Sequence, residues 1–499
     1  MKVVLVNPPQ TLPAKSVGVL EARIHPPLSL LYLAAVLEKK GIEVAIIDAL
    51  VLGEGALFRD GDSLHFGARW QLLKEKIAEL RPDIVGITSP FTSQLRNALA
   101  AARLVREINP DIPVIAGGPH AVVSPGDFLA EKTIDVVVMG EGELILPELI
   151  SHYDGSGSDL SEIKGIAFRN EKGEVVVNVR AAPVDNLDEL PYPAYHLLNL
   201  EDYFHVHEKG FKGRSYASVS QTMPVITSRG CPFNCCFCSV HLHMGRRWRS
   251  HSPENVLGHL RLLKEKYGVR HIDFEDDCIN LNEKRFEEIL DMMIEEKLGL
   301  TWNTPNGLRG DLLNESLVSK MKKSGCLRIT IAPESGDQDT LDNIIDKKLD
   351  LRKIEAAVDL LQKYKIATHA YYIVGFPGET PAKMQRTFDF AARLLKKYGV
   401  VPSVTMASPL IGTRLYNESK KAGYLIKEPA PEDILLGSHP GGEGLLRTDE
   451  FTPKSVRDAI KKFYRRVFFI ALGKAPTLII RDPRAALEKT KGLLKLAAG

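Results

Sequence analysis

The sequence has no excess of either charge, no long uncharged apolar run and few cysteines. Its 65 basic and 63 acidic residues leave a net charge of +2, so no basic surface for nucleic acid is expected. No uncharged stretch reaches the roughly 18 residues that a membrane span needs. The start, MKVVLVNPPQ, has too short an apolar run, and no small-residue cleavage site, for a signal peptide. We therefore expect a cytoplasmic protein, whose thiols stay reduced.

The chain is too long for one hydrophobic core, because it has 499 residues. Apolar residues make up 44% and charged residues 26% of it, which is ordinary for a soluble globular protein. The pattern of the sequence changes three times along its length. We expect an N-terminal α/β domain over 1–150, a linker and strap over 151–215, a second α/β domain over 216–425 and a helical C-terminal region over 426–499.

Buried strands alternate with amphipathic helices in the first region. This pattern predicts a parallel sheet covered on both faces. The predicted strands lie at 2–9, 43–50, 83–90, 112–120 and 134–143. Small or polar residues follow them, where the carboxyl ends of the strands would line a ligand crevice. Each such end is either a tight turn or a ligand contact, and the coincidence of several favours a ligand. These candidates are Thr88, Ser89, Gly117, Gly118, His120, Gly140, Glu141, Gly142 and Glu143.

The alternation restarts after a polar connection, SHYDGSGSDLSE, and a small hairpin, RNEKGEVVVNVR. Within 151–215, the stretch 187–204 has the proline and aromatic content of a strap that packs on a domain surface. Six strand and helix units then suggest a partial barrel that is open on one side, with its active site after the strands. A helix is expected over 252–268, with Ser252 as N-cap and Gly268 at its end. The predicted barrel strands lie at 224–230, 271–277, 300–311, 328–336, 367–379 and 401–410.

Four of the six cysteines lie in the stretch CPFNCCFCS, residues 231–239, directly after a predicted strand. A zinc site usually combines two cysteine pairs, or cysteine with histidine. The other two cysteines, Cys278 and Cys326, stand alone, and His241 and His243 would complete a zinc site only weakly. A redox C-x-x-C pair would open a helix in a different setting. Zinc and dithiol chemistry are therefore disfavoured.

Three of the clustered cysteines form the spacing C-x3-C-x2-C. Three thiolates, from Cys231, Cys235 and Cys238, suit a [4Fe-4S] cluster with one iron left open for a non-protein ligand. Cys236 does not fit the triplet, and we expect it to be a small buried thiol.

The pattern C-x3-C-x-Phe-x-C, formed by Cys231, Cys235, Phe237 and Cys238, resembles the signature of radical S-adenosylmethionine (SAM) enzymes. The N-terminal region resembles cobalamin-binding domains in the stretches PPLSLLYLAAVLEKKG, GITSP, GGPH and GEGE. Together they resemble the cobalamin-dependent radical SAM family across nearly the whole chain. Further matching stretches are PESG, GFPGET and PLIGTRLY.

The resemblance implies a Rossmann-like cobalamin-binding domain over 1–150 and a partial (β/α)6 radical SAM barrel over 216–425. The implied cofactors are a [4Fe-4S] cluster, SAM and cobalamin, with an external electron donor such as ferredoxin or flavodoxin. Reductive cleavage of SAM would release a 5′-deoxyadenosyl radical, which abstracts hydrogen from an unactivated carbon. In most members, the substrate radical then takes a methyl group from methylcobalamin. The expected activity is therefore that of a C-methyltransferase, since the cofactors carry the hard chemistry.

The resemblance also implies contacts to SAM. Phe237 matches the aromatic position whose backbone lies beside adenine, and Glu334 stands where the family places a ribose-binding group. Asp276 or Asp277 would hold the methionyl ammonium, and Arg309 would pair with the SAM carboxylate. For each polar residue, the alternative is a group that stabilises the barrel rim.

The motif Asp-x-His-x-x-Gly, whose histidine ligates cobalt in many cobalamin proteins, is absent from the sequence. His120 in GGPH lacks that context and either contacts the corrin or packs at a turn. We expect cobalamin to be bound without a protein histidine on cobalt. We also expect the GGPH and GEGE loops to face the cysteine loop, with the 187–204 strap bracing the two domains.

Two other functions stay open from the sequence. Radical chemistry without methyl transfer would make the protein an oxidative cyclase or a ring-rearranging enzyme, and a degenerate barrel would make it a cobalamin sensor. The intact cysteine triplet argues against the sensor. The stretch 456–476 is basic and aromatic, and we expect a helix that caps the barrel, with contact to a membrane surface as the alternative. The substrate would be a small molecule or a lipid-like or tetrapyrrole-like compound.

Overall fold

The computed structural model of the protein forms two compact units. Unit 1 comprises Met1–Pro232, Ser239–Asp277 and Glu296–Thr301; unit 2 comprises Phe233–Cys238, Cys278–Glu295 and Trp302–Gly499. Parts of the expected linker (209–215) and C-terminal region (439–441 and 482–499) lie outside the described residues. The structure describes residues 1–13, 24–53, 57–61, 63–208, 219–438 and 442–481.

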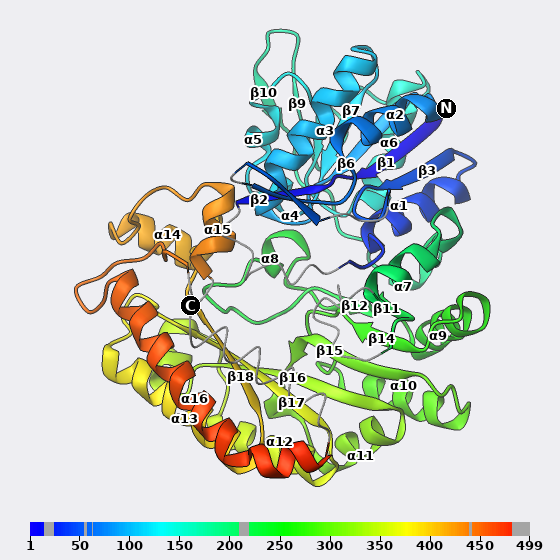
Figure 1. The fold of residues 1–499 in the computed structure, drawn as a ribbon. Helices are drawn as coiled ribbons and strands as arrows, with labels where there is room; N and C mark the ends of the chain where they lie inside the picture. The colour runs from blue at the N-terminus through cyan, green and yellow to red at the C-terminus, as the bar shows by residue number, and fades with distance from the viewer. Residues whose placement is uncertain (14–23, 54–56, 62, 209–218, 439–441, 482–499) are drawn as a thin grey trace. The chain divides into compact units, whose positions relative to one another are not determined.

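A seven-stranded sheet forms the centre of the N-terminal part of unit 1 (Figure 1). Its order is β10-β9-β8-β7-β6-β1-β3. The five strands from β8 to β3 are parallel, as the sequence predicts, and β9 and β10 continue the sheet in antiparallel fashion. The strands are β1 (Lys2–Asn7), β3 (Glu43–Asp48), β6 (Ile84–Thr88), β7 (Val114–Gly117), β8 (Val136–Val138), β9 (Ile166–Arg169) and β10 (Val175–Val177).

Helices cover both faces of this sheet, which confirms the predicted three-layer arrangement. One core packs β-strand residues against α2 (Trp70–Leu80), α3 (Leu95–Ile108) and α5 (Pro125–Leu129). A second core on the other face includes residues of α1 (Leu28–Lys39) and α6 (Gly142–Tyr153). Strands β6 and β8 are fully buried between these layers, as their largely apolar sequences predict.

The hairpin β9–β10 extends the sheet beyond the expected domain end at residue 150. Its first strand pairs with β8, so residues 166–177 are part of the N-terminal sheet rather than of a linker. A small hairpin is expected in this stretch, but its pairing with the N-terminal sheet is not. Val175 and Val177 are 42% and 57% exposed. A three-stranded antiparallel sheet that the sequence pattern does not predict also lies in unit 1: β2 (Gln10–Pro13), β5 (Ser63–Phe66) and β4 (Leu57–Asp60).

The 187–204 strap links the N-terminal sheet domain to the first barrel helix within unit 1. The Ala194 N–H donates to the Leu31 carbonyl of α1 at 3.0 Å. The Tyr192 hydroxyl donates to the Asn255 carbonyl of α9 (Pro253–Tyr267), also at 3.0 Å. The strap therefore makes the bracing contacts that its composition suggests.

The end of the strap is anchored by a buried carboxylate. Tyr203, in α7 (Leu200–Glu208), donates its hydroxyl hydrogen to Asp48 at 2.6 Å, and the Asn7 side chain donates to the same carboxylate at 2.8 Å. Burial raises the pKa of Asp48 from 3.8 to about 6, although these hydrogen bonds oppose the shift.

Unit 1 also contains the first strands of the barrel domain. The strands β11 (Thr222–Val225) and β14 (His271–Phe274) pair in parallel, and the short strands β12 (Ser228–Arg229) and β13 (Arg249–Ser250) form a hairpin. Helix α9 begins at Ser252, whose side chain accepts from the Asn255 N–H. It ends at Gly268, whose φ of +65° is left-handed. Both caps are confirmed.

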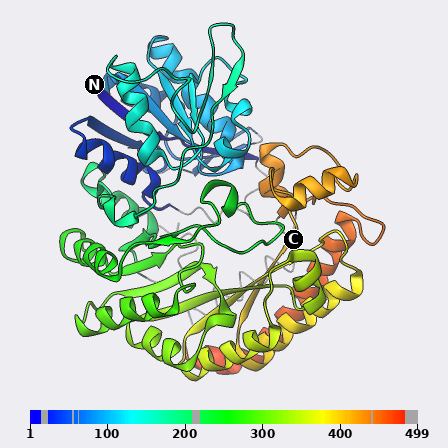
Figure 2. The same ribbon diagram turned by 180° about the vertical axis from the view of Figure 1, so that it is seen from behind.

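Unit 2 holds four further strands in the order β15-β16-β17-β18, all parallel. The six predicted barrel strands are therefore present, two in unit 1 and four in unit 2. Helices α12 and α13 pack against these strands, and α16 packs on α13 and β18 (Figure 2). The elements are β15 (Thr301–Leu308), β16 (Cys326–Glu334), β17 (Ala367–Val374), β18 (Val401–Met406), α10 (Glu283–Glu295), α11 (Glu315–Lys323), α12 (Leu351–Lys363), α13 (Pro381–Tyr398), α14 (Arg414–Lys421), α15 (Pro431–Ser438) and α16 (Pro453–Arg481).

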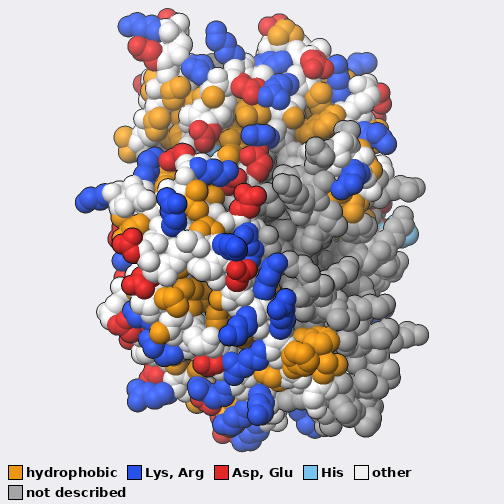
Figure 3. All heavy atoms as spheres, turned by 60° about the vertical axis from the view of Figure 1, so that its left-hand side comes forward, with side chains coloured by type: hydrophobic (Ala, Val, Ile, Leu, Met, Phe, Trp, Pro, Cys, Tyr) orange, Lys and Arg blue, Asp and Glu red, His pale blue; other side chains and the backbone are white. Residues whose placement is uncertain are grey.

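The helix α16 is the capping helix expected from the sequence. Phe463 stacks on Phe388 of α13 with ring centroids 5.1 Å apart, and the Tyr464 hydroxyl accepts from the Val404 N–H at 2.9 Å. Further along, Phe469 is 70% exposed. Within the described residues, no helix combines the length and the apolar content that crossing a bilayer requires. Basic and acidic side chains are interspersed on the described face in Figure 3, in keeping with the small net charge.

We predict that replacing Asp48 by asparagine changes how stability depends on pH. Because the folded-state pKa of Asp48 is about 6, against 3.8 in the unfolded chain, its stabilising effect is complete below about pH 4. The effect is lost as pH rises through 6, and two pKa units correspond to about 3 kcal/mol. At matched ionic strength, the melting temperature of Asp48→Asn should therefore rise relative to that of wild type as pH increases from about 4 to 7. The exposed Glu75→Gln control should track wild type; parallel profiles for all three would contradict the assignment.

Candidate active site

The cysteine loop lies between β12 and the short helix α8 (Val240–His243). Cys231, Cys235 and Cys238 are partly exposed, whereas Cys236 is buried, and all six cysteines of the chain, which fall in its described part, are thiols rather than disulfides. Burial raises the pKa of Cys236 to about 12. Accessible thiols at three positions and a buried, protonated thiol at the fourth fit a cluster bound by the triplet alone.

The main chain of Cys236 holds the cysteine loop in place. Its N–H donates to the Ile345 carbonyl and its carbonyl accepts from the Leu415 N–H, both at 2.9 Å. Arg414 donates to the Asn234 carbonyl at 3.2 Å. The stretch PLIGTRLY therefore acts on the loop backbone, and nothing in this arrangement needs the Cys236 sulfur as a ligand.

The stretch GFPGET presents an aromatic ring to the same loop. Phe376 packs on Phe237 with ring centroids 5.9 Å apart. The turn is fixed by Glu379, which accepts from the Gly375 and Phe376 N–H groups at 2.7 and 3.2 Å. Phe237 is thereby held in one orientation, as a residue beside a cofactor needs to be.

A buried ammonium group lies beside Glu334 at the end of β16. Lys347 donates to the Glu334 carboxylate at 3.0 Å, and both side chains are 9% exposed. Burial lowers the pKa of Lys347, but the charges of Glu334 and Cys235 outweigh it, so the pKa is raised and the ammonium stays charged. Glu334 has a φ of +67°, a left-handed backbone conformation that is uncommon for residues other than glycine. The sequence reading missed Lys347, because nothing local distinguishes it from the lysine that follows.

Arg309 does not have the arrangement expected of a SAM ligand. Its guanidinium forms two hydrogen bonds to Asp311, at 2.8 and 2.6 Å, and donates to the carbonyls of Lys347 and Lys348. It also lies 4.0 Å from the centre of the Phe233 ring. Its donors are thus used by the protein, and the structure favours the alternative of a group that stabilises the barrel rim.

The two neighbouring carboxylates after β14 have different partners. Asp276 is buried and accepts hydrogen bonds from the Thr227 N–H, the Thr227 hydroxyl and the Ser228 hydroxyl. Asp277 is half-buried and accepts from the Gly230 N–H; burial and the charge of Asp276 raise its pKa to about 6. Of the pair, Asp277 is the better candidate for an ammonium ligand, because Asp276 is used to hold the chain that leads into the cysteine loop.

The carboxyl ends of β6 and β7 lie side by side in the N-terminal sheet, since Thr88 pairs with Gly117. Gly118 has a φ of +126°, and a Cβ there would lie 2.2 Å from the Ser89 carbonyl oxygen. Close packing of the two loops therefore explains this glycine without any cofactor. Phe91, which the sequence reading did not single out, is 62% exposed just beyond this edge. The position of Phe91 just after the end of a predicted strand could have identified it as a candidate from the sequence.

His120 packs inside its own turn. Its Nε2 lies 3.1 Å from the Asp127 carboxylate, its ring contacts Phe128, and its side chain is fully buried. It is the second residue of the short helix α4 (Pro119–Val123). Of the two alternatives, packing at a turn is what the structure displays.

The two glutamates of GEGE lie in a buried ion-pair network of unit 1. Arg249 binds Glu141 through both terminal nitrogens at 2.9 and 2.6 Å, and Arg229 binds Glu143 at 2.7 Å. Arg229 also lies 3.5 Å from Glu141. These carboxylates are therefore not directed at a cofactor, and only the backbone of residues 140–143 remains a candidate for contacting one.

This network joins the sheet to the hairpin that carries the cysteine loop. Arg229 ends β12, two residues before Cys231, and Arg249 begins β13. The helix α4, from GGPH, packs beside α8, which follows Cys238. Within unit 1, both strand-end loops thus lie against the segments that flank the cysteine loop.

Comparison with protein families matches two segments of the chain. Residues 225–391 match the radical SAM superfamily, and residues 17–150 match the B12 binding domain. The second match ends before the β9–β10 hairpin.

Individual relatives span nearly the whole chain. An uncharacterized methyltransferase of Pyrococcus horikoshii is 32% identical over 97% of this chain and 94% of its own. The cytidylyl-2-hydroxyethylphosphonate methyltransferase of Streptomyces wedmorensis is 31% identical over 86% of this chain and 83% of its own. The structure of the radical S-adenosylmethionine methyltransferase TsrM from Kitasatospora setae has a similar fold, with a TM-score of 0.69, 18% identity, and coverage of 93% of this chain and 88% of its own.

We predict that the four clustered cysteines respond differently to alanine. After anaerobic reconstitution, Cys231→Ala, Cys235→Ala and Cys238→Ala should each lose the iron–sulfur absorbance and SAM cleavage, because each removes a ligand. Cys236→Ala should retain both, since its thiol is buried and protonated. Iron and sulfide analysis, with 5′-deoxyadenosine measured by chromatography, tests this. Full iron content without SAM cleavage in Cys236→Ala would assign that thiol a function we do not expect.

Proposed function

This chain belongs to the cobalamin-dependent radical SAM enzymes, and from that premise we propose that it transfers a methyl group to an unactivated carbon of a small-molecule substrate. The observation that carries the proposal is the presence in one chain of a matching B12 binding domain, a matching radical SAM domain and an intact cysteine triplet. The two relatives described above are both named as methyltransferases.

Cys231, Cys235 and Cys238 hold the [4Fe-4S] cluster. Their partial exposure fits ligands at a site that SAM must enter, in contrast to buried Cys236. When bound, the cluster supplies the electron that cleaves SAM. The protein fixes the loop by the backbone hydrogen bonds of Cys236, whose thiol is buried.

Three charged side chains and one ring orient SAM. Asp277 receives the methionyl ammonium, and Glu334 accepts from the ribose hydroxyls. Lys347 binds the SAM carboxylate, since it gives one N–H to Glu334 and an ammonium group has three donors. Phe237, braced by Phe376, places its backbone beside adenine. Lys347 takes the place first expected of Arg309.

Cobalamin binds at the carboxyl edge of the N-terminal sheet, where it supplies the methyl group. Thr88, Ser89, Gly117 and the backbone of residues 140–143 line this edge, and exposed Phe91 offers an apolar surface to the corrin. His120 is buried and paired with Asp127, so it would not be available as a ligand of cobalt.

The reaction needs partners outside the chain. A reduced ferredoxin or flavodoxin delivers the electron to the cluster, and the enzyme works in the cytoplasm. For a lipid-like or tetrapyrrole-like substrate, the exposed Phe469 of α16 would contact the membrane surface.

The proposed methyl transfer is tested with SAM that is deuterated in its methyl group. Enzyme reduced anaerobically with cobalamin bound should yield deuteriomethyl cobalamin together with S-adenosylhomocysteine, before any substrate is added. Addition of a small-molecule extract should move the label into one new metabolite, which mass spectrometry detects, in step with 5′-deoxyadenosine. The Cys231→Ala variant is the control for label transfer to substrate. Substrate conversion and 5′-deoxyadenosine without label in any product would instead identify a cyclase or ring-rearranging enzyme.

We predict that Lys347→Met weakens SAM binding about tenfold to a hundredfold, because a hydrogen bond to a charged group contributes about 1.5–3 kcal/mol. Equilibrium binding of SAM to the reconstituted enzyme measures this, with iron content as a check that the cluster is intact. Lys348→Met is the matched control, because the Lys348 side chain is 65% exposed. Equal SAM affinity of both variants at full cluster content would remove Lys347 from the SAM site.

A further inference from the structure

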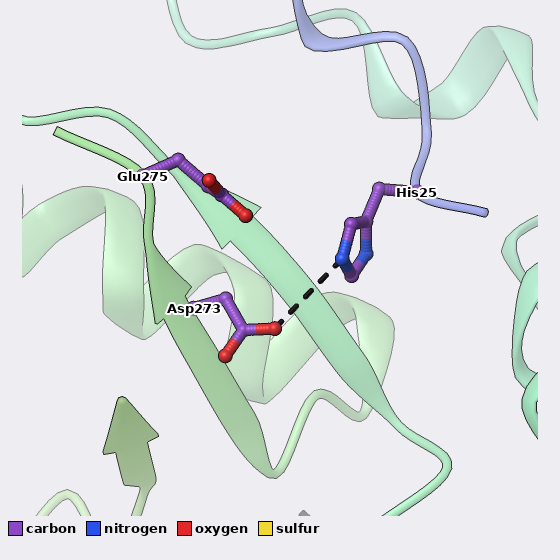
Figure 4. Close-up of side chains that lie close together, drawn as sticks. All are labelled: His25, Asp273 and Glu275. Carbon is purple, nitrogen blue, oxygen red and sulfur yellow. Dashed lines mark ion pairs between the residues drawn. The ribbon is translucent and has the colours of Figure 1, made fainter. Parts of the chain in front are cut away.

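Three potential metal ligands converge in unit 1, and none of them has been given a function above. They are His25, Asp273 and Glu275, whose ligand atoms all lie within 4.8 Å of one another. Figure 4 shows the His25 imidazole and the Asp273 carboxylate pointing toward each other, with Glu275 on the same side of the strand. We propose that these three side chains bind a divalent first-row transition-metal ion such as Mn²⁺, Fe²⁺ or Zn²⁺.

Two features of the sequence place these ligands together. Asp273 lies in β14 and Glu275 follows its end, and residues two apart along an extended chain face the same side. His25 comes from the segment just before α1 and is followed by Pro26 and Pro27, which restrict the backbone next to it. Ligands from two separate segments of unit 1 thus meet at one point.

The spacing suits a metal better than a direct hydrogen bond. His25 Nε2 lies 3.8 Å from Asp273 Oδ2, beyond the roughly 3.2 Å limit of an ordinary N–H···O hydrogen bond. Two ligands bound at about 2.0–2.1 Å to a tetrahedral ion lie about 3.4 Å apart. Only a small adjustment separates the observed distance from that of two ligands on one ion.

The donor atoms and their burial indicate which kind of ion the site would bind. One imidazole nitrogen with carboxylate oxygens suits Mn²⁺, Fe²⁺ or Zn²⁺, whereas Mg²⁺ and Ca²⁺ prefer oxygen alone. Asp273 is fully buried and the His25 side chain is only 11% exposed. A bare ion reaches such groups more easily than a bulky organic cation does. Its double positive charge would balance the two carboxylates.

A second layer of contacts orients the central ligand. The other oxygen of Asp273 lies 3.5 Å from His271 Nε2, and His271 Nδ1 lies 2.7 Å from the Thr301 hydroxyl. Side chains that bind metals are usually oriented by such outer partners. Thr301 thus orients His271, and His271 lies beside Oδ1 of Asp273. The other oxygen, Oδ2, faces His25.

Electron paramagnetic resonance with Mn²⁺ tests the site on the tag-free holoenzyme. With an oxidised [4Fe-4S] cluster and Co(III) cobalamin, both cofactors are silent, so bound Mn²⁺ is read directly. We expect one Mn²⁺ per chain, displaced by Zn²⁺, with nitrogen coupling from one histidine. Asp273→Asn and Glu275→Gln should each weaken binding at least tenfold, and His25→Gln should abolish the nitrogen coupling. His271→Gln should weaken binding by about tenfold or more.

Controls make the result independent of folding and of methyl transfer. The exposed Glu254→Gln variant should bind Mn²⁺ as wild type does. Iron and cobalamin contents of each variant report whether its fold is intact, and no turnover is needed. If wild type binds no Mn²⁺ or Zn²⁺ beyond what the His25→Gln/Glu275→Gln double variant binds, the site does not exist. Nitrogen coupling that persists in His25→Gln would likewise overturn the assignment.

Discussion

Four buried charges determine how the N-terminal sheet of unit 1 meets the hairpin that leads into the cysteine loop. Arg229 and Arg249 come from that hairpin, and Glu141 and Glu143 come from the start of helix α6, which follows β8. The charges balance, and none of the four side chains is more than 9% exposed. Removing one member would leave a buried charge unpaired, which costs about 3–5 kcal/mol. The position of the loop that precedes Cys231 therefore depends on the complete network.

The two cations on the barrel rim of unit 2 illustrate why arginine and lysine are not interchangeable here. The planar guanidinium of Arg309 forms a two-pronged contact with Asp311 and reaches two carbonyls, so it fixes the backbone. The ammonium of Lys347 is a compact charge that keeps further donors after pairing with Glu334. The guanidinium group thus suits Arg309 to stabilising the rim, and the ammonium group suits Lys347 to binding a ligand.

Features governed by neighbouring residues could be predicted from the sequence, and features governed by distant partners could not. The N-cap Ser252 and the left-handed Gly268 follow from local backbone rules, and both are where they were expected. The cysteine triplet is likewise local. The partners of Glu141 lie 108 residues away in Arg249 and 43 residues away in Val184. Neither partner can be inferred from the residues next to Glu141, so the sequence alone is equally consistent with Glu141 as a cofactor ligand.

The β9–β10 hairpin has a consequence for dissecting this protein. Since β9 pairs with β8, it covers an edge that would otherwise present unpaired N–H and C=O groups. A fragment cut at residue 150 would keep every parallel strand and yet expose the buried, all-valine β8 as a template for other chains. Such a piece would tend to self-associate by strand pairing, whereas a piece that continues past Val177 would carry its own protection.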